Sequence, residues 1–214
     1  MRELLVAIGE DPARSELAST PRRVADSYAE FFSGVGVDAR QELGETFPFD
    51  AESAGAGATG PSPEPVLVRG ITFRSVCEHH LLPFRGTAHV AYVPGDRLIG
   101  LGRIPALVQV LANRPQLQER LGEQVARTLS DALDARGVLV VLEASHACVT
   151  LRGPQQFGST TVTVASHGSL SEPAARAELM ALIAAAPSVP SPAQAAATPG
   201  ALPTTVLTPD EVAL

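Results

Sequence analysis

Both cysteines of this 214-residue chain and three of its five histidines lie in two short clusters, at residues 77–80 (CEHH) and 146–148 (HAC). Thiolates and imidazoles are the ligands that zinc prefers in proteins. Two thiolates and one imidazole would give three protein ligands, which is the number in a catalytic zinc site that keeps its fourth position for water. The clusters therefore predict one Zn²⁺ site, with a second histidine in each cluster left for proton transfer.

The spacing within each cluster predicts how its side chains are presented. His146 and Cys148 are two residues apart in a run rich in β-branched residues, which is typical of a strand, so both should leave the same face. Cys77 and His80 are three apart, a separation that suits a helical turn or a tight loop closing on one ion. His79 should then point elsewhere.

Other interpretations of the four residues stay open at this point. Cys77, His80, His146 and Cys148 could close a structural Cys₂His₂ site without water. A disulfide between the cysteines is disfavoured, because the N-terminal sequence MRELLVAIGED has no signal-peptide pattern and a reducing cytoplasm is the default expectation. Unrelated core cysteines and hydrogen-bonded histidines are the third possibility, and the repeated pairing of Cys with His weakens it.

Composition limits the functional class. The chain is 45% hydrophobic, which is enough for a sizeable core, but no apolar run is long enough to span a membrane. A net charge of −7 with no basic block argues against a general nucleic-acid binder. There is no Trp and aromatics make up 4%, so base-stacking platforms are not expected. Any phosphate-bearing ligand must be held by a few local cations.

The pattern of apolar residues predicts an α+β fold. Five segments have helical periodicity: 4–8, a segment beginning at Thr20, 104–113, 116–135 and 174–183. Five segments resemble strands: 65–76, 87–93, 97–101, 138–152 and 160–166. We expect 97–101 to form a hairpin with the strand before it. The order predicts an antiparallel sheet with helices on one face, and open sheet edges that oligomerisation would close.

Composition also divides the chain into four parts. Residues 1–50 form an N-terminal helical segment, and 51–64, rich in Gly, Pro and Ser, are expected to be a mobile connection. Residues 65–186 are expected to be the catalytic domain. Residues 187–214 are rich in Ala, Pro and Thr and are expected to be a disordered tail.

Four stretches carry a family resemblance: GEDPARSELASTPRRVADSYAEFFSG, VCEHHLLPFRGTAHVAYVPGDRLIGL, RPQLQERLGEQVARTL and EASHACVTLRG. Together they closely resemble the GTP cyclohydrolase I family, from about residue 4 to 183. The resemblance implies the tunnelling fold (T-fold), in which an antiparallel sheet with two helices assembles into a toroidal homodecamer. It also implies active sites between subunits.

The same resemblance assigns roles to residues of this chain. It implies Zn²⁺ ligands at Cys77, His80 and Cys148, and acid/base histidines at His79 and His146. The residues implied to bind the guanine nucleotide are Glu119, Gln118, Arg152, Arg103 and Arg23. The implied reaction converts GTP to 7,8-dihydroneopterin triphosphate with release of formate.

The chemistry of this reaction fits the residue types. Opening the imidazole ring of guanine at C8 needs water to attack an aromatic carbon, and a bound zinc makes hydroxide available near pH 7. His146 can protonate N7, and His79 or His146 can pass protons onward. The carboxylate of Glu119 can accept from both N1–H and the 2-amino group, which adenine cannot match. From the sequence alone, an exposed helix charge is the better interpretation of Glu119.

The resemblance is weakest at residues 100–106, which read GLGRIPA. Family members usually have Ser where this chain has Gly102, Lys where it has Arg103, and Arg where it has Ala106. Loss of one cation from a phosphate clamp leaves open an alternative substrate of guanine type without a triphosphate, and loss of the serine hydroxyl leaves open a reaction that stops before pterin closure. The ordinary reaction on GTP stays the first hypothesis, because the guanine and metal motifs are intact. A further alternative is a non-catalytic toroid stabilised by zinc, against which the retention of both His79 and His146 argues.

Overall fold

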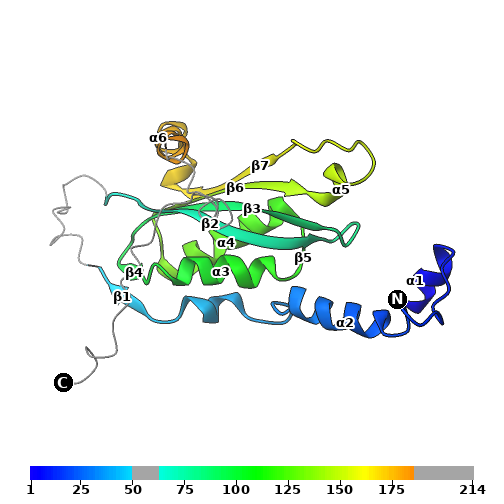
Figure 1. Ribbon diagram of the computed structural model, residues 1–214. Coiled ribbons are helices and arrows are strands. Elements are labelled where there is room, and N and C mark those ends of the chain that lie inside the picture. Colours follow the sequence, from blue (N-terminus) through cyan, green and yellow to red (C-terminus); the bar gives the residue numbers. More distant parts are fainter. Residues whose placement is uncertain (50–62, 186–214) are drawn as a thin grey trace, which may run out of the picture. The chain divides into compact units, whose positions relative to one another are not determined.

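The computed structural model describes residues 1–49 and 63–185 (Figure 1). Most of the predicted connection, residues 51–62, and the whole predicted tail, residues 187–214, lie outside the described residues. Residues Met1–Ala184 form one compact unit.

A five-stranded sheet is the framework of this unit. In spatial order its strands are β5 (Pro115–Gln116), β2 (Val66–Cys77), β3 (Pro83–Val93), β6 (Gly137–His146) and β7 (Thr161–Gly168). The long strands are all antiparallel, and β5 is a two-residue parallel addition to β2. The sequence predicted the four long strands, with ends that differ by several residues for β3 and β6, and did not predict β5.

Side chains of β3 alternate between two buried layers. Ala88, Val90 and Tyr92 belong to the larger core cluster, whereas Ala91 and Val93 belong to a smaller cluster on the opposite face. Strand β6, which pairs with β3, is buried on both faces in the same way. This explains why its sequence is an unbroken apolar run instead of an alternating one.

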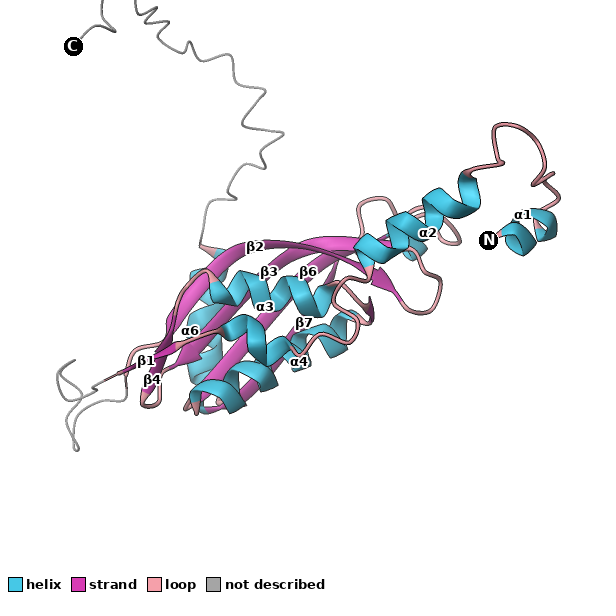
Figure 2. Cartoon of the chain, turned by 90° about the horizontal axis from the view of Figure 1, so that it is seen from below, coloured by secondary structure: helices cyan, strands magenta, loops and turns pink. Residues whose placement is uncertain are grey.

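The larger core lies between the sheet and two helices, α3 (Arg103–Ala112) and α4 (Gln118–Leu133), which lie across one face (Figure 2). Leu121, Val125 and Leu129 are fully buried, as the four-residue apolar repeat predicts. The two helices were predicted from their periodicity, and the α+β architecture is confirmed.

A smaller helix, α6 (Pro173–Ala184), lies on the other side of the sheet (Figure 1). Leu179 packs there with Leu139 and Val141 of β6, and a 3₁₀ turn, η2 (Ser169–Ser171), leads into the helix. The helices thus cover one face fully and part of the other.

The predicted hairpin at 97–101 is wrong. Strand β4 (Arg97–Ile99) pairs instead with β1 (Thr46–Pro48) in a separate two-stranded sheet. The reason is that β3 has no free edge at this point, because Tyr92 already pairs with Val66 of β2 on one side and with Val138 of β6 on the other.

The N-terminal segment is helical, as expected. It contains α1 (Arg2–Ala7), α2 (Thr20–Phe31) and the 3₁₀ helix η1 (Ala39–Leu43). Arg74 of β2 forms a 2.8 Å ion pair with Glu30 and lies 4.8 Å from the ring centre of Phe31. No residue of α2 is buried within this chain. Among the described residues, no helix combines the length and hydrophobicity needed to cross a membrane.

Candidate metal and active site

Three side chains gather where β2 ends. The Sγ atoms of Cys77 and Cys148 and a ring nitrogen of His80 all lie within 4.8 Å of one another. Tetrahedral zinc with ordinary bond lengths places such donors about 3.5–3.8 Å apart, so small side-chain adjustments bring this group to zinc geometry. Two thiols and one imidazole also match the donor preference of zinc, and the three residues therefore fit the ion.

A tight turn presents the first two of these residues. Cys77 is the last residue of β2, and its carbonyl accepts from Leu81 N at 2.9 Å while its own N–H donates to Leu82 O at 2.9 Å. Leu81 has a φ of 52°, a left-handed conformation that lets the chain reverse directly into β3. This is the tight loop that the three-residue spacing predicts, with Cys77 buried and His80 exposed.

The second cluster is built differently from the prediction. Strand β6 ends at His146, and Cys148 lies on a helical turn, α5 (Ala147–Thr150). The shared strand face predicted for His146 and Cys148 is therefore wrong. The physical reason lies in the partner strand β3, in which Phe84 pairs with His146. Pro83, the residue before Phe84, has no N–H with which to continue the hydrogen bonding between the two strands.

His146, the last residue of β6, is held by two other elements, α4 and β3. Its Nε2 lies 2.7 Å from Oε1 of Gln118, the first residue of α4. Its ring stacks on Phe84 of β3, with centroids 4.6 Å apart and planes 8° from parallel. Burial lowers the pKa of His146, and the negative charge of Glu119 opposes that shift. The imidazole thus has a fixed position beside the three-ligand group.

The other groups around the turn are charged or exposed. His79 is exposed, with its ring centre 6.4 Å from that of His80 and nearly perpendicular to it. Nη1 of Arg152 lies 3.4 Å from Nε2 of His80. Burial and the neighbouring Cys77 raise the pKa of the Cys148 thiol. A bound cation would reverse that effect, because zinc ligands bind as thiolates.

Comparison with known proteins identifies the family of this chain. The family model for GTP cyclohydrolase I matches residues 1–184. The chain belongs to the GTP cyclohydrolase I family. It is 60% identical over 181 residues to GTP cyclohydrolase 1 of Leifsonia xyli subsp. xyli, covering 85% of this chain and 90% of that protein. It is 46% identical over 184 residues to GTP cyclohydrolase 1 of Rhodopirellula baltica, covering 86% of this chain and 76% of that protein.

Membership of the GTP cyclohydrolase I family, an enzyme family, confirms the resemblance and the T-fold class inferred from the sequence. Among solved structures, the crystal structure of the archaeosine synthase QueF-Like in the apo form matches with a TM-score of 0.42 and 19% identity. That match covers 51% of this chain and 98% of the other.

One of the cations that the family resemblance assigns to the nucleotide, Arg103, lies away from the metal group in this chain. Arg103 begins α3, and its guanidinium packs against Gly44, where an added Cβ would lie 3.1 Å away. The opposite end of α3 leads into β5 beside Cys77, so a ten-residue helix, about 15 Å long, separates Arg103 from the site. Arg23 is on α2, which contacts the sheet through Glu30.

Two residues beside the predicted ones were missed. Glu78 and Arg120 form an ion pair with two contacts, of 2.6 and 2.8 Å. The pair joins α4 to the turn at residues 77–82, which we call the metal turn because it carries Cys77 and His80. The hydrogen bond from Arg120 holds the pKa of Glu78 below its ordinary value. Their opposite charges within the two motifs, CEHH and QER, were the available signal.

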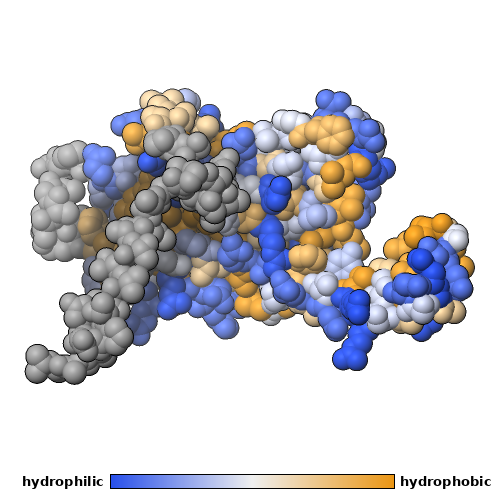
Figure 3. Space-filling view, in the orientation of Figure 1, coloured by the Kyte–Doolittle hydropathy of each residue, from blue (hydrophilic) through white to orange (hydrophobic). Residues whose placement is uncertain are grey.

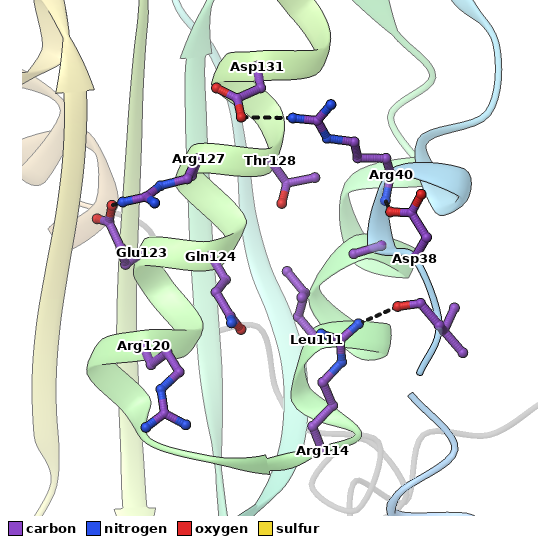
Figure 4. Close-up of a pocket in the computed structure, with 12 residues that line it drawn as sticks. Asp38, Arg40, Leu111, Arg114, Arg120, Glu123, Gln124, Arg127, Thr128 and Asp131 are labelled. Atoms are coloured by element: carbon purple, nitrogen blue, oxygen red, sulfur yellow. Dashed lines mark hydrogen bonds and ion pairs between the residues drawn. The ribbon is translucent and has the colours of Figure 1, made fainter. Parts of the chain in front are cut away.

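A surface pocket of about 490 Å³ lies elsewhere, between η1 and α4 (Figure 4). Four of its charged side chains are already paired, Arg40 with Asp131 at 2.9 Å and Arg127 with Glu123 at 3.0 Å. None of the predicted ligands or catalytic histidines is among its lining residues. The metal group, and not this pocket, is therefore the candidate active site.

Proposed function

We propose that this chain is a zinc-dependent hydrolase of the GTP cyclohydrolase I type, which opens the imidazole ring of GTP at C8, releases formate and yields 7,8-dihydroneopterin triphosphate. The observation that carries the proposal is the Cys77, His80 and Cys148 group with His146 fixed beside it. Support comes from the 60% identity to a protein named GTP cyclohydrolase 1.

Cys77, His80 and Cys148 are the proposed ligands. With three protein ligands, a bound zinc would supply hydroxide at neutral pH from the water in its fourth position. Free thiols suit this role and fit a reducing compartment, so we place the protein in the cytoplasm.

His146 and His79 are the proposed proton carriers. His146 lies at the end of β6, where Gln118 hydrogen-bonds one ring nitrogen and Phe84 stacks on the ring. The fixed imidazole can deliver a proton to N7 of the guanine ring without a large movement of its side chain. His79 is exposed beside His80 and can exchange protons between the site and solvent. Proton delivery at N7 makes C8 more electrophilic and so favours attack by hydroxide.

Glu119 is the proposed guanine anchor. It lies in the first turn of α4, directly after Gln118, and is close enough for its charge to act on His146. Two carboxylate oxygens can accept from N1–H and the 2-amino group, which positions the purine and rejects adenine. Because Gln118 is already hydrogen-bonded within the protein, Glu119 is the stronger of the two candidates for direct contact.

The proposed ligands of the triphosphate are three arginines that the family resemblance implies: Arg152, Arg103 and Arg23. We propose that Arg23 contacts the phosphates and that a neighbouring copy supplies Arg103, because the Arg103 guanidinium packs against Gly44 at the far end of α3 from the metal group of its own chain. This requires a homo-oligomer, for which the family resemblance implies a decamer.

Exposed apolar surface supports oligomerisation. Strand β7 is an edge of the sheet and exposes Val162 and Val164. Helix α1 exposes Leu4 and Val6, and Ile8, the residue that follows it, is exposed as well. Apolar surface is visible on the N-terminal segment in Figure 3. Open edges and apolar patches of this kind are what assembly covers.

The test uses zinc-loaded protein with GTP, GMP, guanosine and guanine as separate substrates, and measures formate and pterin fluorescence independently. The proposal predicts both products from GTP. Formate without fluorescence would instead indicate a reaction that stops at a ring-opened pyrimidine, and formate only from the non-triphosphates would indicate an altered substrate. Neither product from any of the four would contradict the hydrolase assignment and favour a non-catalytic toroid.

A further inference from the structure

Gln118 is a glutamine buried at the start of α4, with 1% of its surface exposed and both ends of its amide hydrogen-bonded. We propose that Gln118 is a positioning residue that fixes His146 in the tautomer with its proton on Nε2. Nδ1 is then the ring atom that exchanges protons with the substrate. The second part of this inference rests on the proposed function, whereas the tautomer does not.

Three acceptors fix which way the Gln118 amide faces. Its Nε2 carries two hydrogens and lies 3.0 Å from the carbonyl oxygen of Leu142, 2.9 Å from that of Thr161 and 3.1 Å from the hydroxyl of Thr163, so one hydrogen is shared between two acceptors. Two of these three are backbone carbonyls, which can only accept. Turning the amide over would place its oxygen against both of them and leave buried polar groups unpaired, which is unfavourable. The NH₂ group therefore faces the sheet.

This orientation decides the proton on His146. With NH₂ turned toward β6 and β7, the atom of Gln118 that faces His146 is Oε1, which can only accept. The 2.7 Å contact to Nε2 of His146 is a hydrogen bond only if that nitrogen carries the proton. A neutral imidazole with a proton on Nε2 has its lone pair on Nδ1. Gln118 thus selects one tautomer, as the carboxylate orienting the base does in hydrolytic triads.

Rigidity of the surroundings makes the selection effective. Phe84 is buried and stacks on the His146 ring, so the ring cannot rotate freely away from Gln118. Gln118 itself joins α4 to two strands, because its acceptors come from both β6 and β7. It also precedes Glu119, so one turn of α4 sets both the guanine anchor and the histidine. Loss of Gln118 should release the tautomer and the ring angle together.

The experiment compares the wild type with Gln118→Met, which keeps the side-chain length and removes both hydrogen-bonding atoms. Solid-state ¹⁵N NMR on protein labelled at its histidines reports which ring nitrogen is protonated, and a His146→Ala sample identifies the His146 signals. We expect protonated Nε2 and bare Nδ1 in the neutral ring of the wild type, and a mixture of tautomers in Gln118→Met. We also expect kcat for formate release to fall about 10- to 100-fold, with a much smaller change in KM.

Gln116→Met is the matched control. Gln116 is also 1% exposed and lies two residues away, but its amide bonds Leu111, Gln124 and Leu117 and not His146. It should lose comparable stability and keep both the His146 spectrum and kcat.

The outcomes separate this inference from the proposed function. A wild-type spectrum with the proton on Nδ1 would overturn the inference without any variant, even if Gln118→Met failed to fold. So would a Gln118→Met protein with an unchanged His146 spectrum and unchanged kcat. Absence of formate from the zinc-loaded wild type would instead overturn the proposed function. The tautomer assignment would then still be decided by the ¹⁵N spectrum of His146.

Discussion

The carboxylate of Glu78 and the guanidinium of Arg120 meet in two contacts of 2.6 and 2.8 Å. Glu78 stands within the metal turn, and Arg120 lies in the first turn of α4, two residues after Gln118. The N–H of Glu78 also donates to Gln116 O at 3.1 Å, just before that helix. The turn that carries two proposed zinc ligands is thus fastened to the helix that carries the proposed guanine anchor.

Removal of this pair should weaken zinc binding more than it weakens the fold. Arg120→Met leaves the turn free to move, and partners outside the immediate ligand set typically change metal affinity by about 10- to 100-fold. Both side chains are partly exposed to solvent, so the effect of the pair on the free energy of unfolding should be small. The measurement is the zinc dissociation constant by competition with a chromophoric chelator, alongside urea unfolding of the metal-free protein.

Arg127→Met provides the comparison for Arg120→Met. Arg127 lies on the same helix and pairs with Glu123 at 3.0 Å, away from the metal turn. The Arg127→Met variant should bind zinc with the same affinity as the wild type. Equal zinc affinity in the two variants would show that the Glu78 contact does not organise the turn.

Cys148→Ser should remove most of the bound zinc and leave a folded protein. Cys148 lies on α5, outside both core clusters, whereas Cys77 belongs to the main core. A serine hydroxyl is a poor substitute for a thiolate toward zinc. Zinc per chain by elemental analysis should fall well below that of the wild type, while a cooperative urea transition persists. Full zinc content in this variant would mean that Cys148 is not a ligand.

Gly86→Ala should destabilise the centre of the sheet by about 3 kcal/mol or more, because a misplaced methyl in a packed core is among the costly single changes. An added Cβ at Gly86 would lie 1.9 Å from the carbonyl oxygen of Glu143 on β6. Gly102→Ala is the control, since no atom lies within 4 Å of its Cβ position and its φ of −68° suits alanine. Urea unfolding of both variants measures the difference, and equal stabilities would contradict the close strand contact.

Glu123→Gln should make stability less sensitive to acid. Burial raises the pKa of Glu123, but hydrogen bonds from Arg127 and His167 outweigh it and leave the pKa below its ordinary value of 4.5. The charged carboxylate therefore stabilises the fold above that value, and this contribution is lost as pH falls below 4.5 toward the folded-state pKa. Urea midpoints at pH 7 and pH 4 should differ less in the variant than in the wild type. An equal or larger difference would contradict the role of Glu123.

Some of this site could be predicted because it depends on residue type and short spacing. The chain has only two cysteines, each beside a histidine, so Cys77, His80 and Cys148 could be grouped without knowing the fold. The long helices and strands could be predicted from their periodicity for the same reason, since the apolar stripe of α4 is a local pattern.

Other features depend on contacts between distant segments and could not be predicted. Strand β6 ends at His146 because its partner strand begins with a proline more than sixty residues earlier. Strand β4 turns to β1 because both edges of β3 are occupied. The role of Gln118 depends on acceptors in β6 and β7 that meet only in the folded chain.

The most direct test of the account is formate release from GTP by zinc-loaded wild type and by His146→Ala, with zinc per chain measured in both samples. We predict that the wild type releases formate and that His146→Ala retains its zinc but releases formate at least about 100-fold more slowly, the usual scale for a general acid–base residue. Formate release by His146→Ala at the wild-type rate, or no formate from the zinc-loaded wild type, would contradict the account.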